Sequence, residues 1–288
     1  MTRQHLAFMM FINLVWGFAL IASKVGLDHF PPMMFTAFRF LLIIAVLFPF
    51  LRLHEGRMKQ VLIIAFCAGP MGFGFFFAGL SLSNPSVVAV VSQLGVPFAT
   101  IMSVVFLGEA VRWRRWLGIA LSFLGVMVIS FDPVVFHFWT GVLCIVISAL
   151  IGSVGTIFQR QIKNVGVFEM QAWIAMVAGP VMLAMSLTFE SHHWEIVKSA
   201  SWLNWSGVLY TAFASSLIGH AGIYYLLQRY EVTQTAPLTL LSPIITVIFS
   251  VLLLGDVVTT RMLVGAAMAL TGILIVSLRE KHIVATGP

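Results

Sequence analysis

Long apolar runs, separated by short polar or proline-containing breaks, occupy almost the whole chain of 288 residues. A helix that crosses a bilayer needs roughly 20 mostly apolar residues, and the breaks leave ten runs of about that length. The break near residues 81–85 has no charge and rests on Asn84-Pro85, which is typical of a turn and a helix start. The pattern predicts an all-α polytopic membrane protein. We expect spans at residues 5–25, 33–51, 60–80, 85–107, 114–131, 136–157, 168–188, 206–226, 233–254 and 260–278.

Part of this pattern occurs twice. The first copy consists of Pro97, Leu107-Gly108-Glu109, Gly118 and Gly125, and the second of Pro243, Leu254-Gly255-Asp256, Gly265 and Gly272. The turn and the glycines recur 147 residues later, and the proline 146 residues later. We therefore predict two five-helix repeats, residues 1–134 and 135–288. An odd number of helices in each half inverts the second repeat, which is a plan typical of transporters with a substrate site between the halves.

Composition agrees with a membrane location. Hydrophobic residues make up 60% of the chain and charged residues 9%, with a mean hydropathy of +1.03, whereas soluble domains carry about 25% charged residues. Cys67 and Cys144 lie inside apolar runs without histidine or carboxylate neighbours, so they indicate neither a disulfide framework nor a metal site. Basic residues form no stripe with interleaved aromatics, which argues against nucleic-acid binding. We expect no cofactor and no metal.

The positions of the basic residues predict the orientation. With both termini in the cytoplasm, 12 of the 16 Lys and Arg residues lie inside, three (Lys24, Lys198 and Arg261) lie outside, and Arg39 lies within a helix. This distribution follows the positive-inside rule. The longest polar stretch, near residues 190–204, contains His192, His193, Glu195 and Lys198, which we interpret as a solvated outer loop rather than a metal site.

The motifs resemble those of the EamA-type, ten-helix branch of the drug/metabolite transporter superfamily. They are Trp16-Gly17 followed by Lys24, Pro32 followed by Phe38-Arg39-Phe40, and the doubled segment described above. Within that family the chain is most similar to bacterial YddG-like exporters of aromatic and other neutral amino acids. The resemblance implies a multi-pass transporter of the bacterial inner membrane that works by alternating access. Ala19 and Gly79 depart from family positions that often carry a polar and an aromatic residue.

Carboxylates are absent from the centres of the predicted spans, because all ten Asp and Glu residues fall at helix ends or in loops. Carriers coupled to protons or sodium usually keep an intramembrane acid whose charge the coupling ion neutralises. The sequence therefore favours uncoupled facilitated diffusion. The alternative is a proton-coupled exporter of cationic drugs or metabolites, which would normally place an acid in its cavity.

Candidate substrate contacts are neutral polar groups and aromatic or apolar walls, a mixture that suits a zwitterion with an apolar side chain. The candidates are Asn13, Gln93, Thr239, Ser242, Trp16, Phe77, Trp173, Met176, Tyr224 and His220. His220 is interpreted either as a cavity ligand or proton relay, or as a histidine satisfied by a neighbouring helix.

Arg39 and the repeated prolines are the candidate gates and hinges. Arg39 lies less than two turns into its helix, where it either snorkels and pairs with Asp28 or forms a gate. Pro97 and Pro243 weaken the helical hydrogen-bond ladder, and each acts as a hinge or as a fixed kink. The acids of the repeated turns, Glu109 and Asp256, are expected to pair with Arg114 and Arg261.

Two other classes of protein remain to be considered. Ser215, Ser216 and His220 lie within two helical turns, as an intramembrane enzyme would require, but no acid lies in a span to orient the histidine. A channel is the other class, but two halves connected by hinges argue against a permanently open pore. We therefore predict a transporter that is not an enzyme, with a small-molecule substrate and the lipid bilayer as partners; the oligomeric state stays open.

Overall fold

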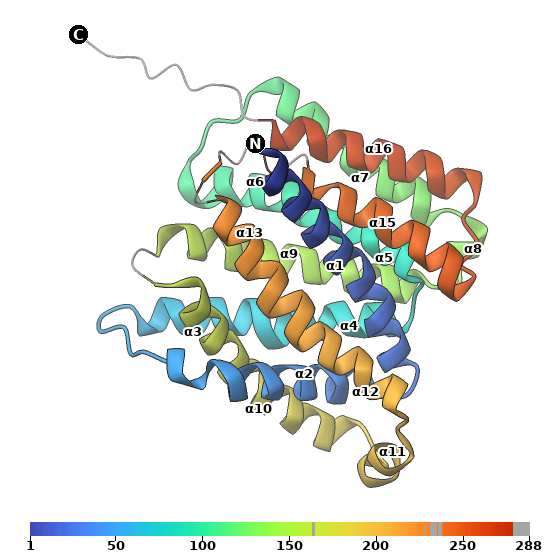
Figure 1. Cartoon of the computed structure of the whole chain (residues 1–288). Helices are drawn as coiled ribbons and strands as arrows, with labels where there is room; N and C mark the ends of the chain where they lie inside the picture. Colours follow the sequence, from blue (N-terminus) through green and yellow to red (C-terminus); the bar gives the residue numbers. More distant parts are fainter. Residues whose placement is uncertain (163–164, 228, 231–234, 236–237, 279–288) are drawn as a thin grey trace.

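The computed structural model describes residues 1–162, 165–227, 229–230, 235 and 238–278, and these form a bundle of helices with no strand (Figure 1). The helices run as α1 (Arg3–Leu27), α2 (Pro32–Leu47), η1 (Phe48–Phe50), α3 (Met58–Phe66), η2 (Cys67–Phe73), α4 (Gly74–Ser81), α5 (Pro85–Val91), η3 (Ser92–Leu94), α6 (Gly95–Leu107), α7 (Trp113–Ser130), α8 (Pro133–Phe136), α9 (Trp139–Gln161), α10 (Val167–Phe189), α11 (His193–Ser199), α12 (Trp202–Leu209), η4 (Tyr210–Gly219), α13 (His220–Leu227), α15 (Leu241–Phe249), η5 (Ser250–Leu254) and α16 (Thr260–Ser277).

Within the described residues, eight helical segments are long and apolar enough to cross a membrane. The two other predicted spans correspond to the consecutive helices α12, η4 and α13 and to the shorter apolar segment formed by α15 and η5. Most of residues 233–237, which begin the ninth predicted span, lie outside the described part. The expectation of an all-α polytopic membrane protein is confirmed.

The uncharged break between the third and fourth spans is a helix boundary, as predicted. Helix α4 ends at Ser81, and α5 begins with Pro85 directly after the N-cap Asn84. The Lys24 ammonium donates to the carbonyls of Leu80 (3.2 Å) and Ser81 (3.0 Å) at the end of α4. A cation at a helix C-terminus satisfies free carbonyls and opposes the negative end of the helix dipole.

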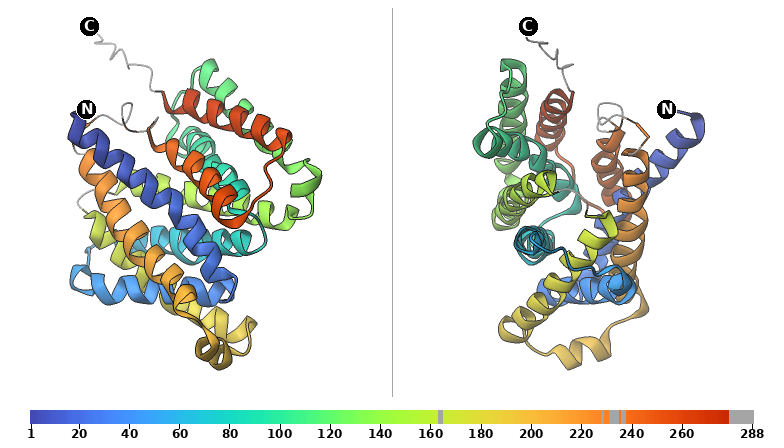
Figure 2. Two further views of the ribbon diagram at one scale, coloured as in Figure 1. Left: turned by 45° about the vertical axis from the view of Figure 1, so that its right-hand side comes forward. Right: turned by 90° about the vertical axis from the view of Figure 1, so that its left-hand side faces the viewer.

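Helices α7 and α16 pack closely through their repeated glycines. A Cβ atom added to Gly118 would lie 2.8 Å from the Gly272 carbonyl oxygen, and one added to Gly125 would lie 2.5 Å from that of Gly265. The contacts pair the first glycine of one copy with the second glycine of the other, so the two helices run antiparallel. Figure 2 shows α16 (red) alongside α7 (green). Such small residues let membrane helices approach backbone to backbone.

The repeated turns use glycine for its backbone freedom. Gly108 and Gly255 have φ angles of 65° and 72°, in the left-handed region where a side chain is disfavoured. The expected pairing of Asp256 with Arg261 is wrong. Asp256 instead accepts hydrogen bonds from the Ser250 hydroxyl and from the amide and hydroxyl of Ser86 at the start of α5. A free helix N-terminus attracts a carboxylate more strongly than an exposed cation does here.

A second carboxylate, Asp132, joins the loop after α7 to the loop before α16. It accepts a hydrogen bond from the Thr259 hydroxyl and one from the Val134 amide (2.9 Å). The Thr259 bond is the main reason that the pKa of Asp132 lies below its usual value, and the charge of Arg261 adds to the effect. The hydrogen bond between Asp132 and Thr259 therefore holds the end of α7 next to the start of α16, and these two helices pack against each other.

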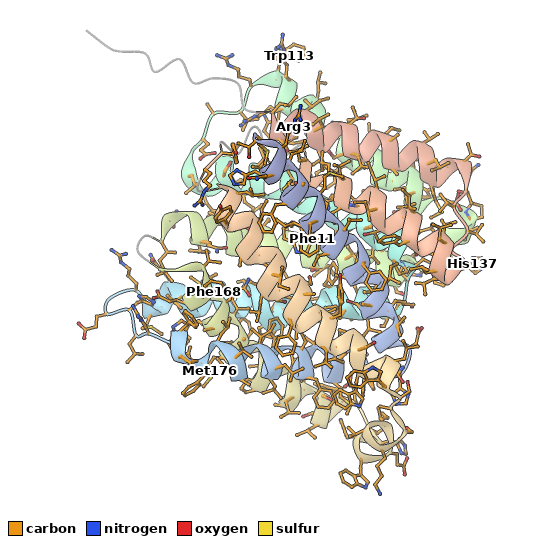
Figure 3. All side chains as sticks on the ribbon, viewed as in Figure 1. Arg3, Phe11, Trp113, His137, Phe168 and Met176 are labelled. Carbon is orange, nitrogen blue, oxygen red and sulfur yellow. The ribbon has the colours of Figure 1, made fainter. Side chains whose placement is uncertain are left out.

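Apolar side chains cover much of the outer surface. Phe11, Trp113 and Met176 are 48%, 66% and 42% exposed, and Figure 3 labels them on three different helices of the bundle. Exposed apolar surface of this extent suits contact with lipid rather than water. The first turn of α1 and the last turn of α16 lie toward the same end of the molecule (Figure 1).

Candidate functional site: a cavity beside helix α1

A cavity of about 330 Å³ lies where α1 meets α5, η3 and α15. This volume falls at the lower end of the range for small-molecule sites, about 300–1,000 Å³. Polar and apolar side chains contribute to its lining, and none of the lining side chains is charged. The lining residues are Trp16, Leu20, Ala89, Ser92, Gln93, Thr239, Ser242, Pro243 and Thr246.

Interrupted helices form one wall of this cavity. The fourth span changes from α5 to a 3-10 turn at Ser92–Leu94 before α6 begins, and Gln93 lies in that turn. Pro97 and Pro243 are each the third residue of an α-helix, α6 and α15. A proline has no amide hydrogen to offer the carbonyl four residues earlier. Those positions are Gln93 and Thr239, and both line the cavity.

Trp16 on α1 forms the opposite wall of the cavity. Contacts on the side of the indole that faces away from the cavity hold this side chain in place. Its indole Nε1 donates to the Ser215 carbonyl at 3.2 Å, and its ring meets the His220 ring edge to face at 5.7 Å. Gly219 makes room for the indole, because a Cβ atom there would lie 2.3 Å from Nε1. The cavity therefore has one rigid aromatic wall, set by contacts between α1 and η4.

His220 supports Trp16 and does not line the cavity. Its Nδ1 lies 3.0 Å from the Ser216 carbonyl and 3.3 Å from that of Ser215. Carbonyls only accept, so Nδ1 carries the proton. The Ser216 hydroxyl donates to the Thr211 carbonyl (2.9 Å) rather than to the imidazole. This geometry fits the second interpretation of His220, a histidine whose hydrogen bonds are satisfied by neighbouring groups. The hydrogen bond between serine and histidine that nucleophilic catalysis needs is not formed between Ser216 and His220.

Arg39 lies in the protein interior, so the expectation that it snorkels to water or pairs with Asp28 is wrong. Its side chain is 3% exposed, and its Nη2 donates to the Ser216 hydroxyl at 2.8 Å. The guanidinium carbon lies 4.3 Å from the centre of the Phe73 ring and 5.2 Å from that of Phe77. Phe77 therefore packs on a cation instead of lining the cavity.

Asn13 does not line the cavity, and the position of the Tyr224 side chain is not described. Asn13 is fully buried one turn before Trp16; its amide donates to the Met9 carbonyl at 2.9 Å, and its Oδ1 has no partner. Tyr224 belongs to α13, but its side chain lies outside the described part of the structure.

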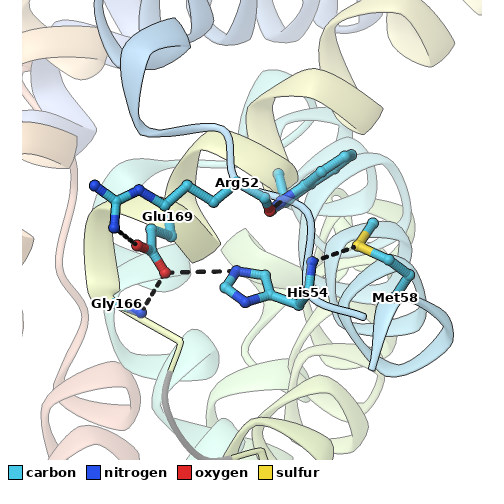
Figure 4. A network of polar contacts seen from close by, with 6 residues as sticks. Arg52, His54, Met58, Gly166 and Glu169 are labelled. Atoms are coloured by element: carbon cyan, nitrogen blue, oxygen red, sulfur yellow. Dashed lines mark hydrogen bonds and ion pairs between the residues drawn. The ribbon is translucent and has the colours of Figure 1, made fainter. Parts of the chain in front are cut away.

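Trp173 lies in the second turn of α10 and does not line the cavity; it contacts Arg52, a member of the polar cluster shown in Figure 4. Its Nε1 donates to the Arg52 carbonyl at 3.0 Å. Glu169 on the same helix accepts from the Gly166 amide at 3.0 Å and lies 3.6 Å from Arg52 and 3.4 Å from His54. These contacts hold the loop after α2 against α10.

The structure thus brings together five of the predicted residues: Trp16, Gln93, Thr239, Ser242 and Pro243. The other four lining residues, Leu20, Ala89, Ser92 and Thr246, were not predicted from the sequence. A helical-spacing signal was present for three of them, because Leu20 and Ala89 lie four positions from Trp16 and Gln93, and Thr246 lies three positions from Pro243.

Charged groups of the predicted outer loop also lie apart from the cavity. His192 contacts Glu195 at 3.0 Å, and both side chains are largely exposed. Among the described residues, no group of three or more His, Cys, Asp and Glu side chains could hold a metal ion.

Comparison with known proteins finds the same sequence family in both halves of the chain. The sequence model of the EamA-like transporter family matches residues 5–131 and again residues 139–278. A protein of Salmonella typhimurium, named as a probable amino-acid metabolite efflux pump, is 26% identical over 96% of this chain and 95% of its own length. An uncharacterised transporter of Bacillus subtilis, YoaV, is 23% identical over 91% and 92%. A crystal structure with 18% identity covers 96% of both chains with a TM-score of 0.64.

Proposed function

Because the chain belongs to the EamA-like transporter family, and is therefore a multi-pass membrane transporter, we propose that it exports small neutral amino acids or related metabolites. The observation that carries this proposal is the uncharged, half-polar cavity beside α1. The name of the Salmonella relative, an amino-acid metabolite efflux pump, supports the same class of substrate. Transport moves the substrate across the membrane without breaking or forming a covalent bond.

The lining suits a zwitterion with an apolar side chain. Gln93, Thr239 and Ser242 offer amide, hydroxyl and carbonyl groups to an ammonium and a carboxylate. Among the described residues, the Gln93 amide has no hydrogen-bond partner within the protein. Trp16 and Leu20 offer apolar surface, and the face of an indole ring attracts an ammonium by about 0.5–2 kcal/mol.

The mechanism we propose is alternating access without ion coupling. The two repeats, residues 1–134 and 135–288, rock against each other around the cavity, with Pro97 and Pro243 as hinges beside it. Interrupted helices at a site between inverted repeats are typical of such carriers. The absence of a carboxylate from the cavity lining supports uncoupled diffusion. We place both termini in the cytoplasm of a bacterium, following the distribution of basic residues.

The alternative function is proton-coupled export of cationic drugs or metabolites. It requires a negative group to offset the charge of the cargo, and the lining provides none. Arg39 donates to Ser216, next to the Ser215 carbonyl that holds Trp16, and its positive charge would repel a cation.

Counterflow in proteoliposomes tests the proposal directly. Purified protein is reconstituted without an ion gradient, and the exchange of labelled phenylalanine and methionine is compared with that of aspartate and a quaternary ammonium ion. We expect exchange of the two neutral amino acids only. Exchange of the quaternary ammonium alone would overturn the proposal in favour of the alternative, and uptake driven by a pH gradient alone would refute the uncoupled mechanism.

A pair of variants links the activity to the cavity. Gln93→Leu keeps a similar side-chain size but removes the amide, and we expect it to weaken exchange of neutral amino acids at least about fivefold, the equivalent of one lost hydrogen bond. Met176→Leu is the matched control, because Met176 is 42% exposed and lies outside the cavity lining. Equal loss in both variants would contradict the assignment of the cavity.

A further inference from the structure

Arg39 is a buried cation without a counter-charge. Among the described residues its guanidinium has no carboxylate within 4.0 Å, and its only hydrogen-bond partner is the neutral Ser216 hydroxyl. The Nε atom is buried and has no hydrogen-bond partner within the described part of the chain. Arginine carries five donors in a planar fork that matches a carboxylate, so most of this donor capacity is unused.

Three phenylalanine rings surround this guanidinium. Its central carbon lies 4.3 Å from the ring centre of Phe73 and 5.2 Å from the ring centres of Phe40 and Phe77. Aromatic faces stabilise a cation but leave its in-plane N–H groups free. These rings shield the guanidinium from water, and in such surroundings attraction to an incoming anion is stronger than in water.

A short chain of contacts connects Arg39 with the cavity wall. Arg39 bonds to Ser216, and the adjacent Ser215 carbonyl accepts from the indole of Trp16, which lines the cavity. Ser215 and Ser216 belong to the π-helical segment η4, and Phe73 ends the π-helical segment η2. Arg39 thus lies between two irregular helices, the kind of segment that is frequent at functional sites.

Resting on the proposed function, we propose that the carboxylate of the transported molecule replaces Ser216 as the partner of Arg39 during transport, once the Trp16 wall has moved, and that Ser216 holds the guanidinium in place when no cargo is bound. The cargo is then an amino acid or another molecule with a carboxylate next to an apolar group. Analogues in which an amide replaces the carboxylate are poor cargo, because they carry no negative charge to neutralise the buried guanidinium.

Competition in the counterflow assay tests this assignment. Unlabelled phenylalanine, phenylalaninamide and 3-phenylpropionate compete against labelled phenylalanine in the wild-type protein. We expect the two carboxylates to compete and the amide to require at least about tenfold higher concentration, which corresponds to about 1.4 kcal/mol. Equal competition by the amide would overturn the assignment while leaving amino-acid transport intact; no exchange of phenylalanine by the wild type would overturn both proposals.

Variants of Arg39 separate carboxylate binding from a structural role. Arg39→Gln and Arg39→Lys are compared with Ser216→Ala by the ratio of acid to amide affinity measured on the same sample. A smaller amount of folded protein lowers the total exchange but leaves both affinities, and therefore this ratio, unchanged, so the ratio reports binding alone. We expect Arg39→Gln to abolish the preference, and Arg39→Lys and Ser216→Ala to reduce it. A ratio equal to that of the wild type in the folded variants would refute the proposal.

Discussion

Replacing Gly125 by alanine should destabilise the protein, because one methyl group would enter the contact between α7 and α16. The added Cβ atom would lie 2.5 Å from both the Gly265 carbonyl oxygen and the Ala269 amide nitrogen. These are backbone atoms that cannot rotate away, so the helices must separate by roughly 0.9 Å to restore the 3.4 Å at which ordinary contact begins. Overpacking of this kind costs about 1–3 kcal/mol.

Thermal unfolding of the purified protein in detergent measures this cost. For a chain of this size a change of 1 kcal/mol moves the melting temperature by about 2–4 °C, so we expect a fall of at least about 2 °C. Gly152→Ala is the matched control, because a Cβ atom there meets nothing within 4 Å in the middle of α9. That change should stabilise the helix by roughly 0.5–1 kcal/mol. If Gly125→Ala melts no lower than Gly152→Ala, the close packing of α7 on α16 is refuted.

Three further predictions concern the cavity wall, a helix-end carboxylate and the prolines. Trp16→Phe keeps an aromatic wall but loses the indole hydrogen bond, so amino-acid exchange measured by counterflow should weaken about fivefold; an unchanged rate would contradict a fixed wall. Because Thr259 lowers the pKa of Asp132, the carboxylate stabilises the fold above its unfolded pKa of about 3.9 and loses this effect as the pH falls toward its folded pKa. Asp132→Asn should therefore show a smaller fall in melting temperature between about pH 5 and pH 3 than the wild type. Pro97→Ala and Pro243→Ala restore amide donors and should slow maximal exchange severalfold without changing KM; unchanged rates would favour fixed kinks.

Patterns of hydrophobicity and turn chemistry were sufficient to predict the helices. Their spans follow from apolar length, and local residues set their ends, as Asn84 and Pro85 do for α5. The repeated glycines lie at helical spacing, which is typical of close helix packing, and the structure shows that the two copies pack on each other. These features depend on neighbouring residues or on a repeat, and both are visible in the sequence.

Long-range polar partners could not be predicted in the same way. Asp256 was expected to pair with Arg261, five residues away, yet its partner Ser86 lies 170 residues earlier. Arg39 was expected near Asp28, but its partner Ser216 lies 177 residues later. Which polar group meets another depends on how distant helices pack, and an exposed ion pair is too weak to decide that packing.

The doubled sequence also gives the cavity two unlike sides. Gln93 and Thr239 are separated by 146 residues, the same separation as the prolines that follow them, so equivalent backbone positions present an amide in one half and a hydroxyl in the other. The two halves therefore present different polar groups to the cavity. A zwitterion carries opposite charges at its two polar groups, and only a site whose halves differ in this way can fix its orientation during transport.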